Sequence, residues 1–77
     1  MPPLRVELDR RRKGKVATII SGFEDDARLA ADTAAKLKKS LAVGGSVADG
    51  EVLLQGDCRA RVADALKALG FNKVRVI

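Results

Sequence analysis

Residues 4–22 contain two strand-like runs separated by a short, strongly basic connection. Every second residue from Leu4 to Leu8 is apolar and the residues between them are charged, which is the period of two of a strand with one buried face. Residues 16–20 are mostly β-branched, which favours a return strand. Gly14 can adopt a positive φ in the reversal between them. The pattern predicts a β-hairpin and commits the first part of the chain to a sheet.

The connection between the two strands, residues 9–15, reads Asp-Arg-Arg-Arg-Lys-Gly-Lys and concentrates the charge of the chain. The formal net charge is +5, and residues 5–15 alone hold six basic and two acidic side chains. Because like charges in one loop repel each other, an anionic partner would stabilise this loop. We interpret it as an anion-binding loop, and a solvated turn that only aids solubility is the alternative.

The chain of 77 residues is long enough for one domain, spanning residues 1–77. We expect residues 1–3 to be flexible, since Pro2 and Pro3 cannot join a central strand. A single cysteine excludes an internal disulfide and fits a reducing compartment. No apolar run approaches the ~20 residues of a membrane span, and the first residues lack the apolar core of a signal peptide. The sequence therefore predicts a cytoplasmic protein without a membrane partner.

The sequence contains no His, Trp or Tyr, which limits the kinds of catalysis, metal binding and base stacking that the protein can perform. Histidine is the commonest general base and a frequent metal ligand. Aromatic rings are the usual platforms on which unpaired bases stack. We therefore expect no enzymatic activity, no cofactor and no metal, and we expect any RNA binding to depend on phosphate contacts and shape.

The acidic segment at residues 24–26 opens the first predicted helix, which runs to about Ser40 with Asp25 as its N-cap. Apolar residues at spacings of three and four give this helix one buried face, formed by Ala27, Ala30, Ala34, Leu37 and Leu41. Basic residues gather near its far end: Lys36, Lys38 and Lys39. They either offset the negative end of the helix dipole or form a second anion-binding patch, and the sequence favours neither interpretation.

Gly44 and Gly45 interrupt the chain, and residues 46–48 are predicted to be extended. Asp49-Gly50 between apolar flanks is typical of a two-residue hairpin turn, because both residues tolerate a positive φ. Residues 51–55 form the next predicted strand. Its consecutive apolar residues indicate burial on both faces or a central position in the sheet.

A second helix is predicted over residues 58–69, with Asp57 as its N-cap and Gly70 as its stop. Its core side carries Cys58, Val62, Ala65, Leu66 and Leu69. A helix N-terminus can lower a thiol pKa, but the spacing points Cys58 inward, so we interpret it as a structural thiol. Residues 73–77 alternate again and form the last predicted strand.

The predicted order is ββαββαβ, an α+β two-layer sandwich with a mixed sheet of four or five strands and two helices on one face. The opposite face would then be open, with Arg5, Glu7, Lys73 and Arg75 on it. Because a whole helix joins the fourth strand to the fifth, that pair is expected to be parallel.

A series of short motifs covers nearly all of the chain: Arg12-Lys-Gly-Lys15, Thr18-x-Ile20-x-Gly22-Phe23, Lys36-Leu-Lys-Lys39, Gly44-Gly-Ser46, Asp49-Gly50, Gln55-Gly-Asp57, Arg59 and Gly70-Phe71. In this order and spacing they resemble the translation initiation factor one family, the Sui/YciH-type group of start-codon fidelity factors. No single motif is specific, but the ordered set is.

The resemblance implies the ββαββαβ sandwich and a protein that binds the small ribosomal subunit near the P site and influences start-codon selection fidelity. It implies a monomer, with rRNA and the initiator tRNA complex as candidate partners. It places the rRNA contacts on the basic loop and the first helix, which by position are Arg10, Arg11, Arg12, Lys13, Lys15, Lys36 and Lys39. Gln55 also matches, and we interpret it as strand-end packing or hydrogen bonding; Asp57 is interpreted as a cap, and direct RNA contact is the alternative for both.

Two departures from the family pattern limit the resemblance. Ala42 and Val43 stand where several relatives carry cysteines, so a family metal site is not expected. The chain also lacks the insertion that eukaryotic members carry between the third and fourth strands, so its short turn at Asp49-Gly50 resembles the prokaryotic branch. Two other functions stay open: a protein-interaction module that uses the open sheet face or the last strand as an edge, and an RNA-binding protein without ribosome specificity.

Overall fold

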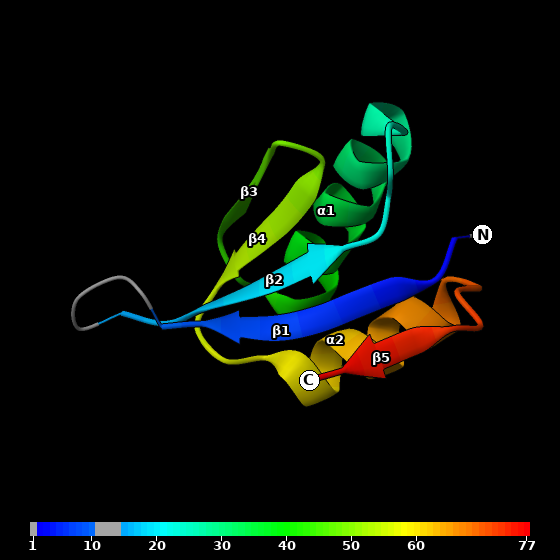
Figure 1. Ribbon diagram of the computed structural model, residues 1–77. Coiled ribbons are helices and arrows are strands. Elements are labelled where there is room, and N and C mark those ends of the chain that lie inside the picture. The colour runs from blue at the N-terminus through cyan, green and yellow to red at the C-terminus, as the bar shows by residue number, and fades with distance from the viewer. Residues whose placement is uncertain (1, 11–14) are drawn as a thin grey trace.

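The computed structural model describes residues 2–10 and 15–77, and these residues form strands and helices in the predicted order ββαββαβ. The elements are β1 (Leu4–Asp9), β2 (Ala17–Ser21), α1 (Ala27–Leu41), β3 (Gly45–Ala48), β4 (Glu51–Gln55), α2 (Arg59–Ala68) and β5 (Val74–Val76). Figure 1 shows that the ends of β1 and β2 that lead to the basic loop project from one end of the molecule.

Within the described residues, the strands form one five-stranded sheet in the order β3-β4-β2-β1-β5. β2 is antiparallel to both β1 and β4, β3 is antiparallel to β4, and β5 is parallel to β1. The expected pairing of the fourth strand with the fifth is wrong, because β5 lies at the far edge beside β1. The two strands do run in the same direction, but α2 packs against β1 and β5 and so carries the chain across the sheet.

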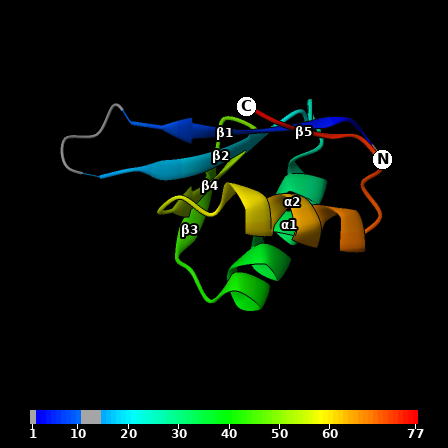
Figure 2. The same cartoon turned by 90° about the horizontal axis from the view of Figure 1, so that it is seen from below.

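The helices lie on one face of the sheet, as predicted, so the molecule is a two-layer α+β sandwich (Figure 2). α1 packs against β3 and β4, and α2 packs against β1 and β5. Strand register places Arg5 and Glu7 on the face without helices, and Arg75 pairs with Arg5 on that face. Lys73 precedes β5 and is exposed.

The core lies between the sheet and the helices and is mostly aliphatic, with two phenylalanines. Its fully buried side chains include Val6, Ile20, Phe23, Leu37, Val52, Leu54, Val62, Leu66 and Phe71. The two rings meet edge to face, with their centroids 6.3 Å apart and an interplanar angle of 90°. This contact joins the connection after β2 to the connection before β5, because Phe23 and Phe71 lie in those connections.

The start of α1 differs from the prediction by one residue. Its N-cap is Asp26, whose carboxylate accepts a hydrogen bond of 2.9 Å from the backbone N–H of Leu29. Glu24 adopts a φ of +56° and the backbone N–H of Asp26 donates to the carbonyl of Phe23, so a turn occupies the residues before the cap. The helix therefore begins at Ala27, which is exposed rather than in the core.

The start of α2 differs in a similar way. Its N-cap residue is Cys58, which makes no side-chain cap, so the predicted N-cap at Asp57 is wrong by one residue. The carboxylate of Asp57 binds the guanidinium of Arg59 and also accepts a hydrogen bond of 3.4 Å from the backbone N–H of Arg59, the first residue of the helix. After the helix, Gly70 has a φ of +104°, in keeping with its predicted role as a stop.

The second hairpin and β4 agree with the sequence analysis. Asp49 and Gly50 have φ values of +53° and +75°, so both residues are left-handed, as a type I′ turn requires. The apolar run of β4 was predicted to mean either burial on both faces or a central position in the sheet. β4 lies between β3 and β2, which confirms the central position. Val52 and Leu54 are buried towards the helices, and Leu53 is half-buried on the other face.

Candidate nucleic-acid interface

Two of the predicted loop cations, Arg10 and Lys15, lie near the two ends of the basic loop and are described by the structure. Asp9 at the end of β1 pairs with Ala17 at the start of β2, which brings both cations to the same end of the sheet. Both side chains are exposed, and neither forms an ion pair within residues 2–10 and 15–77. The other predicted loop residues, Arg11, Arg12 and Lys13, lie outside the described residues.

The predicted lysines of α1 are exposed and lie close together on its solvent-facing side. Lys36 and Lys39 are three residues apart, so they are neighbours on the helix surface. The ammonium of Lys36 lies 3.1 Å from a carboxylate oxygen of Asp32, one turn earlier. Both residues of this ion pair are more than half exposed, so the pair is weak and leaves Lys36 open to another anion.

The C-terminal end of α1 has a cationic partner from another element. A guanidinium nitrogen of Arg61 in α2 donates a hydrogen bond of 3.1 Å to the backbone carbonyl of Leu41. Ala42 then turns left-handed, with a φ of +55°, and its N–H donates to the carbonyl of Lys38. Arg61 thus helps to offset the negative end of this helix, beside Lys38 and Lys39 in its last turn.

A buried hydroxyl joins the base of the basic loop to the segment between β4 and α2. Thr18 of β2 is fully buried, and its Oγ1 donates to the carbonyl of Gly56 at 2.7 Å and accepts from the N–H of Cys58 at 3.0 Å. The N–H of Gly56 donates to the carbonyl of Val16 at 3.0 Å. We call these three hydrogen bonds the Thr18 clamp. It holds the backbone next to Lys15 against residues 56–58.

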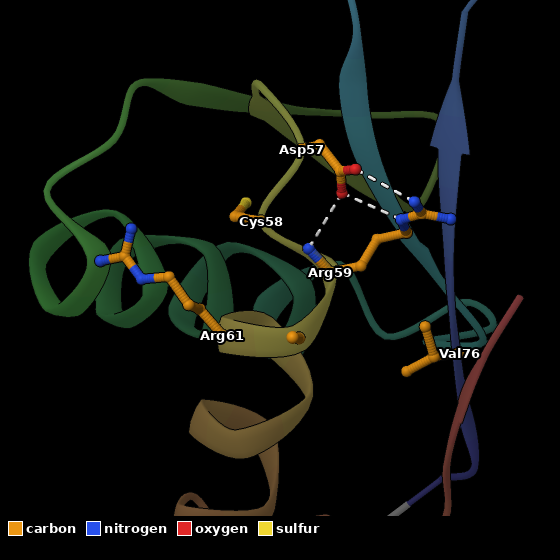
Figure 3. Close-up of a pocket in the computed structure, with 6 residues that line it drawn as sticks. Asp57, Cys58, Arg59, Arg61 and Val76 are labelled. Atoms are coloured by element: carbon orange, nitrogen blue, oxygen red, sulfur yellow. Dashed lines mark hydrogen bonds and ion pairs between the residues drawn. The ribbon is translucent and has the colours of Figure 1, made fainter.

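Beside the clamp, Asp57 and Arg59 form a paired acid and base on the surface (Figure 3). The Nε and Nη2 of Arg59 donate to the two carboxylate oxygens of Asp57 at 2.9 and 3.0 Å. The hydrogen bond from Arg59 lowers the pKa of Asp57 below its usual range, and the carboxylate raises the pKa of Arg59 in return. Arg59 also donates to the carbonyl of Ile77 at 3.1 Å. The guanidinium of Arg59 is therefore bound by partners within the protein. Figure 3 shows that Arg61 points away from this pair.

Comparison with known proteins identifies the family. Residues 1–72 match the family model described as translation initiation factor SUI1. The chain belongs to the SUI1 family. It is 36% identical over 74 residues to a protein translation factor SUI1 homolog of Sulfolobus acidocaldarius, covering 96% of this chain and 75% of that relative. It is 44% identical over 70 residues to the homolog of Thermococcus gammatolerans, covering 91% of this chain and 71% of that relative.

Membership in the SUI1 family confirms the resemblance drawn from the ordered motifs and places the chain among translation initiation factors. The homolog of Methanocaldococcus jannaschii, 40% identical over 70 residues, covers 91% of this chain and 68% of that relative. The residues described for this SUI1 chain contain no group of three or more His, Cys, Asp or Glu side chains that could hold a metal ion. Within the same residues, no helix is both long enough and apolar enough to cross a membrane.

The sequence analysis did not identify Thr18 and Arg61, whose hydrogen bonds connect the elements of the candidate interface. Thr18 lies in a β-branched run, where a threonine is expected simply as a strand former. Arg61 reads as one more surface cation of a helix. Their partners are 20 to 40 residues away in the chain, so no local pattern could have found either contact.

Proposed function

We propose that this SUI1-family chain is a ribosome-binding initiation factor that docks on the small subunit near the P site and raises the accuracy of start-codon selection. The observation that supports it best is the exposure of Arg10 and Lys15, without ion pairs among the described residues, at the end of a rigid sheet. It would act in the cytoplasm as a monomer, by binding rather than by catalysis. Its direct partner would be rRNA, with the initiator tRNA complex nearby.

The basic loop is the primary contact in this proposal. Guanidinium and ammonium groups bind phosphate oxygens without reading base sequence, so the shape of the rRNA must supply the specificity. The Thr18 clamp fixes the backbone at Val16 before any RNA is bound. A loop whose base is already ordered loses less conformational entropy on binding, which favours affinity.

The lysines of α1 are the secondary contact. Lys36 and Lys39 are exposed, and Arg61 already binds the last carbonyl of α1. A second phosphate contact from another element would fix the orientation of the factor, since the loop alone leaves it free to rotate. Arg11, Arg12 and Lys13 belong to the primary contact by their place in the sequence.

Accuracy would follow from thermodynamic linkage between the factor and codon–anticodon pairing. A factor that binds the subunit less tightly after any codon–anticodon pairing disfavours every paired complex by the same free energy. A cognate pair is stable enough to form despite this cost, and a mismatched pair is not. The factor then increases the difference in occupancy without any chemical step.

The binding part of the proposal is tested with matched double substitutions. In the loop variant, Arg10 and Lys15 are replaced by Gln; in the control, Lys67 and Lys73 are replaced by Gln, which removes the same charge elsewhere. Small-subunit affinity is measured by sedimentation at graded salt. The loop variant should bind more weakly, with the slope of log affinity against log salt reduced by about 0.7–0.9 per lost phosphate contact. Equal affinities of the loop variant and the wild type would contradict the proposal.

A separate measurement tests accuracy and ribosome specificity. Initiation complexes are assembled on messages with a cognate or a near-cognate start codon, with and without the protein. The near-cognate complex should lose more occupancy than the cognate one, and equal losses would reject the accuracy role. Equal affinity for unrelated structured RNA would instead identify an RNA-binding protein without ribosome specificity.

A further inference from the structure

A small cleft lies on the face of the sheet without helices, where β2 and β4 separate. Its volume is about 330 Å³, and it is lined by Lys15, Val16, Ala17, Leu53, Gln55 and Gly56. Ala17 and Gln55 are the last pair of the β2–β4 ladder, so the cleft opens where the chain enters β2 from the basic loop. A site for the same RNA that the loop is proposed to bind would lie next to the phosphate-binding cations.

The cleft is lined by three apolar side chains, Val16, Ala17 and Leu53, beside the polar side chains of Lys15 and Gln55. Ala17 is 6% exposed and Leu53 is half-buried. The backbone groups of Gly56 are already used, because its N–H donates to Val16 and its carbonyl accepts from Thr18. Apolar walls with a few convergent polar groups are the usual composition of a site for a small organic ligand or fragment.

Two polar side chains of the cleft have no partner within the described residues: the amide of Gln55 and the ammonium of Lys15. The backbone fixes Gln55, since its N–H donates to the carbonyl of Gly44 at 2.9 Å. Its side chain rests against Gly44, where an added Cβ would lie 3.1 Å from the amide oxygen. The glycine therefore leaves room for the amide at the edge of the cleft.

We propose that this cleft binds one unpaired nucleotide of RNA, with the base against Gln55 and the adjoining phosphate against Lys15. The proposal rests on the proposed function, because it extends the RNA contact of the basic loop. A glutamine amide presents a donor and an acceptor side by side, which matches the N6 and N7 of adenine. Adenine is therefore the expected base. With no aromatic ring in the cleft, the base is selected by these hydrogen bonds and by apolar contact with Ala17 and Leu53.

The charges around the cleft favour a nucleotide over a neutral ligand and give it one orientation. Lys15 stands at the side that leads to the basic loop, with Arg10 across the hairpin. The phosphate would therefore lie at Lys15 and the base would point along the sheet towards Gln55.

The sequence offers a direct test, because Gln55 and Asn72 carry its only side-chain amides. In an NMR titration with adenosine monophosphate, the amide resonances of Gln55 should shift and those of Asn72 should not. The backbone signals of Ala17 and Leu53 should move with Gln55. Equal shifts of both amides, or no shift of either, would overturn the proposal.

Binding of short homopolymers supplies the second measurement. The wild type should bind oligoadenylate about tenfold more tightly than oligouridylate at the same salt. Gln55→Met should remove this preference, Asn72→Met should keep it, and Lys15→Gln should weaken binding to both. Gly44→Ala should act like Gln55→Met, because the three atoms nearest to the new Cβ all belong to the amide of Gln55, at 3.1–3.4 Å.

If the wild type binds both homopolymers equally, or if the Gln55→Met variant keeps the preference, the proposal that the cleft binds a base is disproved. The proposed function fails on a different result, namely unchanged small-subunit affinity when Arg10 and Lys15 are replaced. The two failures are therefore separate, since a chain can hold rRNA phosphates without reading a base.

Discussion

The buried hydroxyl of Thr18 should contribute to the stability of the fold, because it makes two hydrogen bonds to the backbone. Thr18→Val keeps the shape of the side chain but leaves the carbonyl of Gly56 and the N–H of Cys58 without a partner in the core. Burying these unsatisfied groups should lower the free energy of unfolding by about 1–3 kcal/mol, measured by urea denaturation. Thr18→Ser restores the hydroxyl and should recover most of the loss. Equal stability of the valine variant and the wild type would show that the clamp contributes nothing.

The backbone of Ala42 has a conformation that is unfavourable for alanine and that glycine adopts easily. It has a φ of +55°, and a left-handed conformation costs an L-residue about 1–2 kcal/mol. Ala42→Gly should raise the free energy of unfolding by about 0.5–1 kcal/mol, since the greater entropy of glycine in the unfolded chain cancels part of the gain. Ala35→Gly in the exposed interior of α1 is the matched control and should cost about 1 kcal/mol. Two substitutions of the same type should thus have opposite signs, and destabilisation by both would contradict the argument.

The helices and strands follow from the sequence because their apolar periods are local. The alternation from Leu4 to Leu8 and the Asp49-Gly50 turn each predict one element without reference to the rest of the chain. The helix starts were each misplaced by one residue because the local backbone conformation and side-chain pairing decide them: the left-handed φ of Glu24 and the ion pair between Asp57 and Arg59.

The position of β5 and the contacts of the site could not be predicted for a related reason. Which strand β5 joins depends on where α2 packs, and that depends on the shape of the whole core. The exposure of Arg10 and Lys15 was foreseeable from charge alone, since a cluster of cations stays in water. The clamp at Thr18 was not, because strand propensity does not distinguish a bonded hydroxyl from a methyl group.

The contact between Phe23 and Phe71 should couple the two connections in which they lie. Each ring is fully buried, and the two meet edge to face at 6.3 Å. Phe23→Leu and Phe71→Leu, alone and together, form a double-mutant cycle measured by chemical denaturation. The expected coupling is about 0.5–1.5 kcal/mol beyond the loss from each substitution alone. Additive losses would show that each ring packs independently against the aliphatic core.

The distribution of charge over the molecule should control the rate of association with RNA. The end of β1 and the start of β2, next to which Arg10 and Lys15 lie in the chain, are at one end of the molecule, and the end of α2 and the start of β5 are at the other (Figure 1). Lys67 is in the last turn of α2 and Lys73 directly precedes β5. The two double variants described above therefore have the same net charge but lose it at opposite ends.

If net charge alone attracted the protein to RNA, both variants would associate with small subunits at the same reduced rate. We expect instead that replacing Arg10 and Lys15 slows association several-fold at low salt, while replacing Lys67 and Lys73 has little effect, because steering depends on the charges nearest the contact. Stopped-flow measurements should show the difference shrinking as salt rises, since the screening length falls from about 10 Å at 0.1 M to about 3 Å at 1 M. Gln55→Met should change the dissociation rate rather than the association rate, because a hydrogen bond formed after docking does not steer the encounter. Equal slowing of both double variants would mean that the protein docks through its overall charge and not through the basic end.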